Sequence, residues 1–206
     1  LARQAKAGGM GMNIDAEEQD RLVLSLKVIE AVLSDPSLAG WDGFGVVVQA
    51  YGKRAGAAID VLYEMASRYD RRMNIRLVKG AYWDSEMKLA QVGGMPGFPL
   101  FTSKTATDVA YICLAQKLFG MGDRLFPQFA THNAQTLSAI MSMAGPDYYP
   151  GQYEFQCLHG MGETLYDQVV GKDNLDKACR IYAPVGSHET LLAYLVRRLL
   201  ENGANS

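Results

Sequence analysis

The sequence predicts an α/β fold in which parallel strands are covered by helices. Strand-like and helix-like segments alternate about six times along the 206 residues, with short connections between them. The strand-like segments read as apolar on both faces, which is typical of parallel strands buried under helices. A barrel and an open doubly wound sheet both fit this alternation. No Gly-rich dinucleotide fingerprint follows a strand-like segment, and this favours the barrel.

Each expected element rests on a local pattern of apolar residues. Short apolar runs predict strands over residues 10–15, 43–51, 75–83, 126–133, 153–159 and 180–185. Apolar residues at helical spacing predict helices over residues 16–33, 55–69, 105–118, 134–144, 163–170 and 187–203. Residues 1–9 resemble the last turns of a further helix, and the Gly- and Pro-rich residues 93–104 are expected to form a loop.

The last expected helix, over residues 187–203, carries a dense cluster of charged and hydroxyl side chains. Ser187 is a suitable N-cap, and the leucines and valine between positions 191 and 200 form an apolar stripe that predicts packing on a core. Tyr194, Arg197, Arg198 and Glu201 share one helix face through their spacing. Two adjacent guanidinium groups suit an anion clamp that holds a carboxylate or phosphate. The alternative is a solvated helix edge with intrahelical ion pairs.

Composition narrows the class of protein. The net charge is −2 with both signs dispersed, which argues against nucleic-acid binding by this chain and against a basic membrane-surface patch. No apolar run is long enough to span a bilayer. The three cysteines, at positions 113, 157 and 179, have apolar neighbours and read as buried thiols in a reducing compartment. The three histidines lie too far apart for a zinc motif, so no metal is expected.

Polar residues recur in the expected strands or at their C-terminal ends. In a parallel barrel these ends converge on one mouth, so residues scattered along the sequence would line a single pocket. Any one of them could instead be a satisfied core polar group. The recurring residues are Asp15, Gln49, Arg76, Lys79, Tyr82, His132, Asn133, Gln156 and Tyr182.

The chemistry of these residues suits a large anionic ligand with an electron-rich ring. Most of them, together with Lys104, are hydrogen-bond donors, and Trp83 with the tyrosines offers flat surfaces for rings. No nucleophile–base pair is evident among them. Lys79 could form a Schiff base as in a lyase, and a non-catalytic anion-binding or assembly module is a third possibility. A bound cofactor that performs the chemistry accounts for the pattern better.

Several segments resemble a known family. NIDAEE, VVVQAYGKR, RLVKGAYWDSE, FTSKTATDVAY, PQFATHNAQT, YEFQCLHGMGE and RIYAPVGSHETLLAYLVRRLLENGAN are similar to the proline dehydrogenase domain of bifunctional proline utilization A, and the similarity covers essentially the whole chain. The resemblance implies a distorted eight-stranded α/β barrel that binds FAD. It also implies oxidation of L-proline to Δ1-pyrroline-5-carboxylate by hydride transfer from proline C5 to flavin N5.

The resemblance also implies roles for individual residues. Arg197 and Arg198 match the pair that grips the substrate carboxylate, and Asp15 matches the carboxylate that pairs with a lysine beside the substrate. Arg76 matches the arginine near flavin N5. The residues that match the proline pocket are Tyr82, Tyr182, Tyr194 and Leu158. Further positions around FAD are matched by Gln49, Lys79, Gly80, Ala81, Trp83, Thr102, Lys104, Thr105, His132, Asn133, Gln156 and Glu201.

The resemblance sets expectations for domain organisation and partners. Family members have two strands before NIDAEE, so residues 1–206 are expected to form one barrel domain that lacks its first two strands. We expect the missing N-terminal barrel segment, a pyrroline-5-carboxylate (aldehyde) dehydrogenase domain in the full-length protein and a quinone electron acceptor as partners. The expected location is cytoplasmic, with peripheral contact to the inner membrane in the full-length protein.

Overall fold

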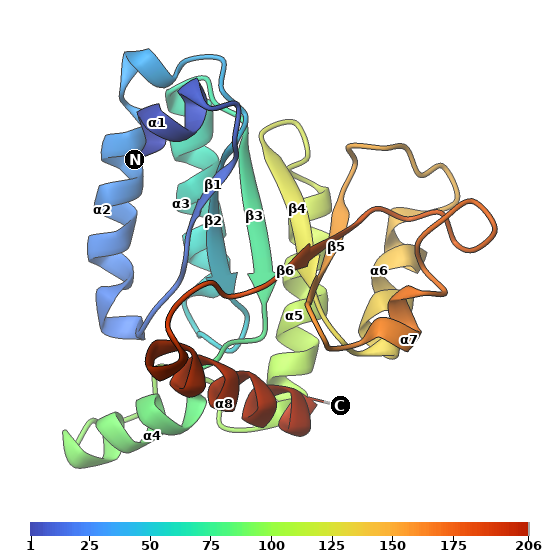
Figure 1. Cartoon of the computed structure of the whole chain (residues 1–206). Helices are drawn as coiled ribbons and strands as arrows, with labels where there is room; N and C mark the ends of the chain where they lie inside the picture. The colour runs from blue at the N-terminus through green and yellow to red at the C-terminus, as the bar shows by residue number, and fades with distance from the viewer. Residues whose placement is uncertain (206) are drawn as a thin grey trace.

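Six parallel strands form one curled sheet, a half-barrel (Figure 1). The computed structural model describes residues 1–205, except the side chains of residue 190 and of residues 200–205. The strands lie in the order in which they occur in the chain, and each pairs in parallel with the next. In a doubly wound sheet the strand order changes direction at one point, and here it does not. The prediction of a barrel-type fold is therefore confirmed. The strands are β1 (Met12–Ile14), β2 (Phe44–Gln49), β3 (Met73–Val78), β4 (Leu125–Ala130), β5 (Glu154–Leu158) and β6 (Cys179–Tyr182).

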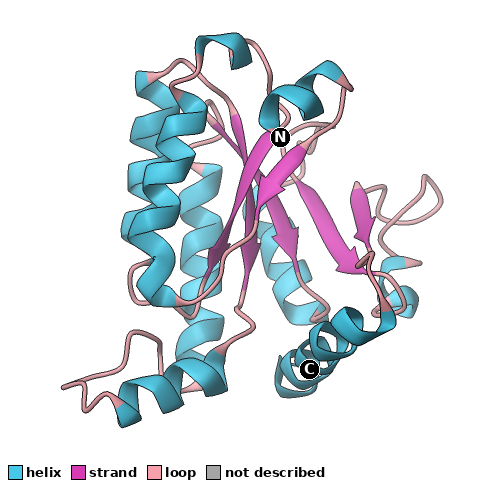
Figure 2. Cartoon of the chain, turned by 60° about the vertical axis from the view of Figure 1, so that its left-hand side comes forward, coloured by secondary structure: helices cyan, strands magenta, loops and turns pink. Residues whose placement is uncertain are grey.

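Helices cover the outer face of the sheet. Crossovers between neighbouring parallel strands are right-handed, so an unbroken strand order places their helices on the same side. Figure 2 shows helices along one side of the strands, and the C-terminal helix beyond the arrowheads. The helices are α1 (Ala2–Ala7), α2 (Leu22–Leu33), α3 (Ala55–Arg68), α4 (Trp83–Val92), α5 (Lys104–Phe119), α6 (Ala134–Ala144), α7 (Glu163–Tyr166) and α8 (His188–Asn205), with 3₁₀ turns at Gln19–Arg21 and Pro36–Leu38. None of those described is both long and apolar enough to cross a membrane.

The two faces of the sheet differ in polarity. On β3, Met73, Ile75 and Leu77 are fully buried in the core shared with the helices, whereas Asn74 and Arg76 are half-buried on the opposite face. The prediction that the strands are apolar on both faces is therefore wrong for β3. The inner face of a barrel has no helix layer against it, so polar side chains can be kept there when they satisfy one another.

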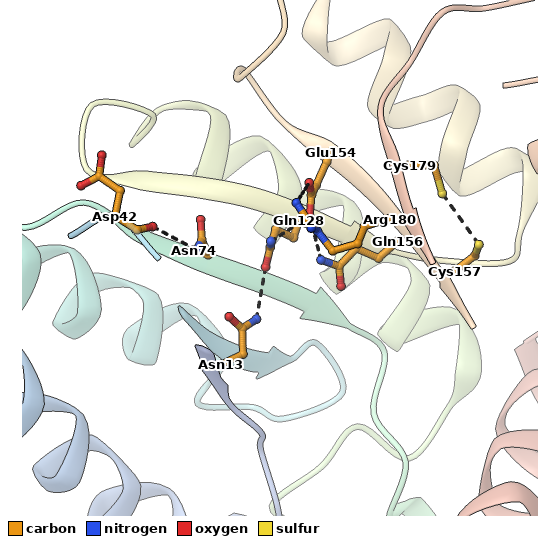
Figure 3. A network of polar contacts seen from close by, with 9 residues as sticks. All are labelled: Asn13, Asp42, Asn74, Gln128, Glu154, Gln156, Cys157, Cys179 and Arg180. Atoms are coloured by element: carbon orange, nitrogen blue, oxygen red, sulfur yellow. Dashed lines mark hydrogen bonds and ion pairs between the residues drawn. The ribbon is translucent and has the colours of Figure 1, made fainter. Parts of the chain in front are cut away.

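A polar network lies across the inner face (Figure 3). Glu154 Oε1 accepts hydrogen bonds from Gln128 Nε2 at 2.8 Å, Gln156 Nε2 at 2.9 Å and Arg180 Nε at 2.8 Å. Arg180 Nη2 adds a bond of 3.0 Å to the second carboxylate oxygen, and Asn13 Nδ2 donates to Gln128 at 3.2 Å. The buried carboxylate is thus fully paired, and the network links β1, β4, β5 and β6.

Helix α4 was not predicted. The expected strand over residues 75–83 ends at Val78, and α4 begins at Trp83 after a four-residue turn. The sequence did carry a signal, because Asp84 and Glu86 lie in the first helical turn and two glycines follow the last one. Glu86 is buried and accepts a hydrogen bond from the backbone N–H of Gln19, which fixes α4 against the loop after β1.

Helix α8 lies across the C-terminal ends of the strands (Figure 1) and not on the helix layer. The prediction that its apolar stripe packs on a core is wrong for the described side chains, because Leu192 is 57% and Leu199 is 64% exposed. A helix that crosses strand ends presents only one face to the barrel. That face carries Tyr194, Arg197 and Arg198, which are all half-buried.

Candidate active site at the barrel mouth

The C-terminal ends of the strands and α8 enclose a small cavity of about 30 Å³. Its walls come from the ends of β1, β2 and β3, from the turn after β3, and from α8. The structure therefore brings predicted residues from four separate segments to one place. Those that line the cavity are Asp15, Gln49, Arg76, Ala81, Tyr82, Tyr194 and Arg198.

Both arginines of α8 stack on tyrosine rings. The Arg197 guanidinium lies 5.5 Å from the ring centre of Tyr82, and that of Arg198 lies 4.8 Å from the ring centre of Tyr194. Stacking uses the flat face of the guanidinium and leaves its edge for bidentate hydrogen bonds. Arg197 Nε is buried and has no hydrogen-bond partner among the described residues. The side chain of Glu201 lies outside the described residues, so its expected pairing with the arginines is untested.

Arg76 is held in the same way on the sheet. Its guanidinium lies 4.1 Å from the ring centre of Tyr182, and this contact brings β6 to the mouth. Its Nε is buried, with no hydrogen-bond partner in the described part of the chain. Tyr111 ties β3 to β4 nearby, since its hydroxyl lies 3.1 Å from the carbonyl oxygen of Leu77 and 3.2 Å from that of Ala130.

Glu17 holds Tyr82 and was not predicted. The Tyr82 hydroxyl donates to Glu17 Oε2 at 3.1 Å, and Gln49 Nε2 donates to the Glu17 carbonyl at 2.9 Å. Burial and the Glu17 carboxylate raise the pKa of Tyr82 above its usual value. Gln49 Oε1 is buried and has no partner among the described residues. Glu17 lies two residues after Asp15, but the run DAEEQD resembled a helix start.

His132 and Leu158 meet at the ends of β4 and β5. The backbone N–H of Leu158 donates to His132 Nε2 at 3.1 Å, which in the neutral imidazole puts the proton on Nδ1. Asn133 caps α6, because its side-chain oxygen accepts from the N–H of Thr136 at 2.9 Å. Gln156 is buried and belongs to the inner-face network through its bond to Glu154.

Lys79 is buried and pairs with the partly exposed carboxylate of Asp108, a contact that was also not predicted. Its Nζ is 2.6 Å from Asp108 Oδ1, and its side chain is only 9% exposed. This pairing counts against a Schiff-base role, because that role needs a free amine. Trp83 Nε1 donates to the carbonyl of Phe101 at 2.9 Å and so joins α4 to the loop before α5. The remaining predicted positions there are exposed: Thr102, Lys104 and Thr105.

Gly80 lies where no other residue fits. Its φ of +132° is accessible to glycine but strained for L side chains, and an added Cβ would lie 2.4 Å from ring carbons of Tyr51. The Tyr51 hydroxyl in turn accepts a hydrogen bond of 3.3 Å from the backbone N–H of Tyr82. The turn between β3 and α4 thus positions Ala81 and Tyr82 at the mouth.

The cysteine prediction is only partly confirmed. Cys157 is buried and Cys179 is half-buried, but Cys113 is exposed on α5. Its outward position on that helix, and not its apolar neighbours in sequence, decides its exposure.

A family model and several known proteins match this chain over its whole length. The proline dehydrogenase family model matches residues 1–206. The bifunctional protein PutA of Klebsiella aerogenes and that of Escherichia coli K12 are each 61% identical to the chain over its whole length. The chain spans only 16% of the length of these relatives.

Solved structures of proline utilization A proteins give the same result. A crystal structure of a Bradyrhizobium japonicum PutA variant has a TM-score of 0.93 and 57% identity, and the match covers 100% of this chain and 21% of that one. The Bdellovibrio bacteriovorus protein, described as inactivated by N-propargylglycine, has a TM-score of 0.91 and 36% identity over 99% of this chain and 21% of that one. With a family match over every residue and this agreement in fold, the chain belongs to the proline dehydrogenase family.

Proposed function

We propose that this chain supplies the substrate and cofactor site of an FAD-dependent proline dehydrogenase, which oxidises L-proline to Δ1-pyrroline-5-carboxylate in the first step of proline catabolism. Family membership supports this proposal, since proline dehydrogenases are flavoenzymes. The observation that carries it is the pair of half-buried guanidinium groups that α8 presents to the barrel mouth opposite Arg76 and Asp15.

The arginine pair is suited to the proline carboxylate. Arg197 and Arg198 are held in place by their tyrosine partners, so little side-chain freedom is lost when a ligand binds. The buried Nε of Arg197 lacks a partner among the described residues, and a bound carboxylate would supply one. A solvated helix edge explains neither the burial nor the stacking.

The other pocket residues would shape the space around the proline ring. Tyr82, Tyr182 and Tyr194 offer ring surfaces, and Leu158, which is 2% exposed, offers an apolar side chain. Asp15, exposed at the end of β1, would pair with a lysine supplied by another part of the longer protein. These residues would orient proline, and orientation can supply much of a rate enhancement.

Polar groups at the mouth are suited to the polar edge of a flavin ring. Two buried polar atoms there have no partner in the described part of the chain: Arg76 Nε, a donor, and Gln49 Oε1, an acceptor. The flavin ring carries both acceptors and donors and could pair with both. When bound, FAD supplies at N5 the acceptor for the hydride from proline C5. Arg76 would place positive charge beside the flavin and favour its electron-rich reduced form. Because Gly80 has no side chain, the backbone there could approach the flavin closely. The remaining proposed FAD positions are Lys79, Ala81, Trp83, Thr102, Lys104, Thr105, His132, Asn133, Gln156 and Glu201.

The proposal includes a longer protein. The matched relatives are named bifunctional, and the chain spans a small part of them. We expect residues 1–206 to be part of one barrel domain, accompanied by a pyrroline-5-carboxylate dehydrogenase domain that consumes the product. A quinone would take the electrons at the inner membrane surface, with the protein in the cytoplasm.

The proposed function is tested on the purified protein that contains this chain. We expect a flavin absorbance spectrum in the visible range that is bleached by L-proline, and turnover with an artificial electron acceptor. A colourless protein without proline turnover would overturn the proposal. A lyase that uses Lys79 would instead be trapped with its substrate by borohydride.

The clamp is tested by removing one guanidinium. Arg198→Ala should raise the KM for proline tens-fold or more, because a carboxylate that loses a charged partner loses on the order of 2 to 4 kcal/mol. Pyrrolidine lacks the carboxylate, so its kinetics should change little in the same variant. Arg68→Ala is the matched control, since Arg68 pairs with Glu30 on the outer helices. An unchanged KM for proline, or an equal loss for pyrrolidine, would contradict the clamp.

A further inference from the structure

Two cysteines lie together on the helix-facing side of β5 and β6. The sulfur of Cys179 is 3.7 Å from that of Cys157 (Figure 3). Both belong to the core between sheet and helices, whereas their neighbours Gln156 and Arg180 point to the inner face. The pair is therefore separated by the sheet from the candidate active site, and the proposed reaction does not use it.

The register of the strands favours a bridged pair of thiols over a disulfide. Cys179 pairs with Phe155, and Cys157 pairs with Ile181, so the two cysteines are diagonal neighbours. With strands about 4.8 Å apart and a rise of about 3.3 Å per residue, such diagonal positions are about 8 Å apart, beyond the usual Cα separation of a disulfide. The Cys179 thiol donates a weak hydrogen bond to the sulfur of Cys157, so the two groups are already in contact. Two sulfurs about 2.3 Å from one tetrahedral atom are about 3.8 Å apart, and pyramidal trivalent arsenic has smaller bond angles, so a bridging arsenic needs only a small further approach of the two sulfurs.

A cavity of about 340 Å³ opens beside the pair and indicates the shape of the ligand. Both cysteines line it, together with apolar side chains and a few polar ones. The other lining residues include Leu158, His159, Met161, Glu163, Asp167, Val170 and Ile181. A cavity of about 150 Å³ is enough for benzene, so an aryl group has ample room. No group of three or more metal-binding side chains occurs in the part of the chain described, which disfavours a metal ion that needs a full protein ligand set.

We propose that Cys157 and Cys179 form a dithiol binding site for a trivalent organoarsenical, whose arsenic bridges the sulfurs and whose organic group enters the adjacent cavity. The arsenic–oxygen bond of an arsine oxide breaks, two arsenic–sulfur bonds form, and the oxygen leaves as water with the two thiol protons. Arsenic stays trivalent and no oxidant is needed. Burial raises the pKa of the Cys157 thiol and that of Cys179, the latter to about 12, so both protons are present at neutral pH.

Phenylarsine oxide added to the purified protein tests the proposal. Peptide mapping by mass spectrometry should recover the β5 and β6 segments joined through a single phenylarsenic group. Excess of a small dithiol should release the adduct, whereas an equal concentration of a monothiol should not. Iodoacetamide treatment of the wild-type protein under mild unfolding conditions should block the site in advance.

Variants separate this pair from other thiols. Cys157→Ala and Cys179→Ala should each weaken binding at this site at least tenfold, because a single sulfur loses the chelate. Cys113→Ala is the matched control and should bind as wild type, since Cys113 is exposed on α5. An adduct that persists in either variant of the pair, or wild-type segments recovered without the arsenic bridge, would overturn the proposal. The wild-type result holds even if a variant folds poorly.

Discussion

Replacing Gly80 by alanine should damage both stability and the candidate active site. The backbone there has a φ of +132°, and the new Cβ would lie 2.4 Å from the Tyr51 ring. Tyr51 is 2% exposed, so its ring has little room to move away. Because the Tyr51 hydroxyl binds the N–H of Tyr82, any movement of the ring also moves the start of α4.

The magnitude follows from two costs. A non-glycine residue in a sparsely populated backbone region costs about 1 to 3 kcal/mol, and overpacking of a buried contact costs a further ~1 to 3 kcal/mol. The reduced entropy of the unfolded chain offsets about 0.4 to 1 kcal/mol. We therefore expect the free energy of unfolding to fall by about 1 to 5 kcal/mol, with the upper half of this range if Tyr51 cannot shift.

Urea unfolding and the KM for proline measure the two effects. The matched control is Gly56→Ala in α3, where the added Cβ would lie 3.8 Å from Leu114 in ordinary contact. Gly56 lies in the first turn of α3, where this change should stabilise by less than about 1 kcal/mol, because alanine loses less backbone freedom on folding than glycine. Gly80→Ala combined with Tyr51→Ala should cost less than the sum of the two single changes, because the overlap disappears.

Two results would refute this reasoning. One is a Gly80→Ala protein as stable as wild type with an unchanged KM. The other is strict additivity of the double variant, which would show that the ring of Tyr51 is not what excludes a side chain at position 80.

Two further predictions concern hydroxyl groups. Glu17→Gln should lower the pKa of Tyr82 toward its usual value, because the Glu17 carboxylate helps to raise it. Tyrosinate absorbance during an alkaline titration measures this effect, with Tyr82→Phe as the reference. The same change should raise the KM for proline several-fold. Tyr153→Phe should stabilise the fold by about 1 kcal/mol, since the buried hydroxyl of Tyr153 has no partner among the described residues. Burial raises the pKa of Tyr153 to about 12 from 10.0, so between these values the unfolded chain ionises first, and wild-type stability should fall with rising pH more steeply than that of Tyr153→Phe. Equal slopes in urea unfolding across this range would contradict the prediction.

Most of the fold could be predicted from the sequence because its signals are local. Short apolar runs located all six strands, and helical spacing located α3, α5 and α6 to within one residue at each end. Helix α4 was missed although Asp84, Glu86 and the glycines after it indicated a helix, because the strand signal before it was extended too far. The hydrogen bonds of Glu154 on the inner face could not be predicted, since they come from Gln128 and Arg180 on neighbouring strands.

The sequence by itself determined the alternation of strands and helices, the family, and the adjacency of Arg197 and Arg198. These depend on residues that are close along the chain, where the periods of strand and helix fix which side chains share a face. Tertiary structure alone decided that α8 turns its arginines inward and leaves Leu199 exposed, that Glu17 holds Tyr82, and that Cys157 meets Cys179. The physical reason is that strand register and helix orientation depend on contacts between distant segments, which no local pattern encodes.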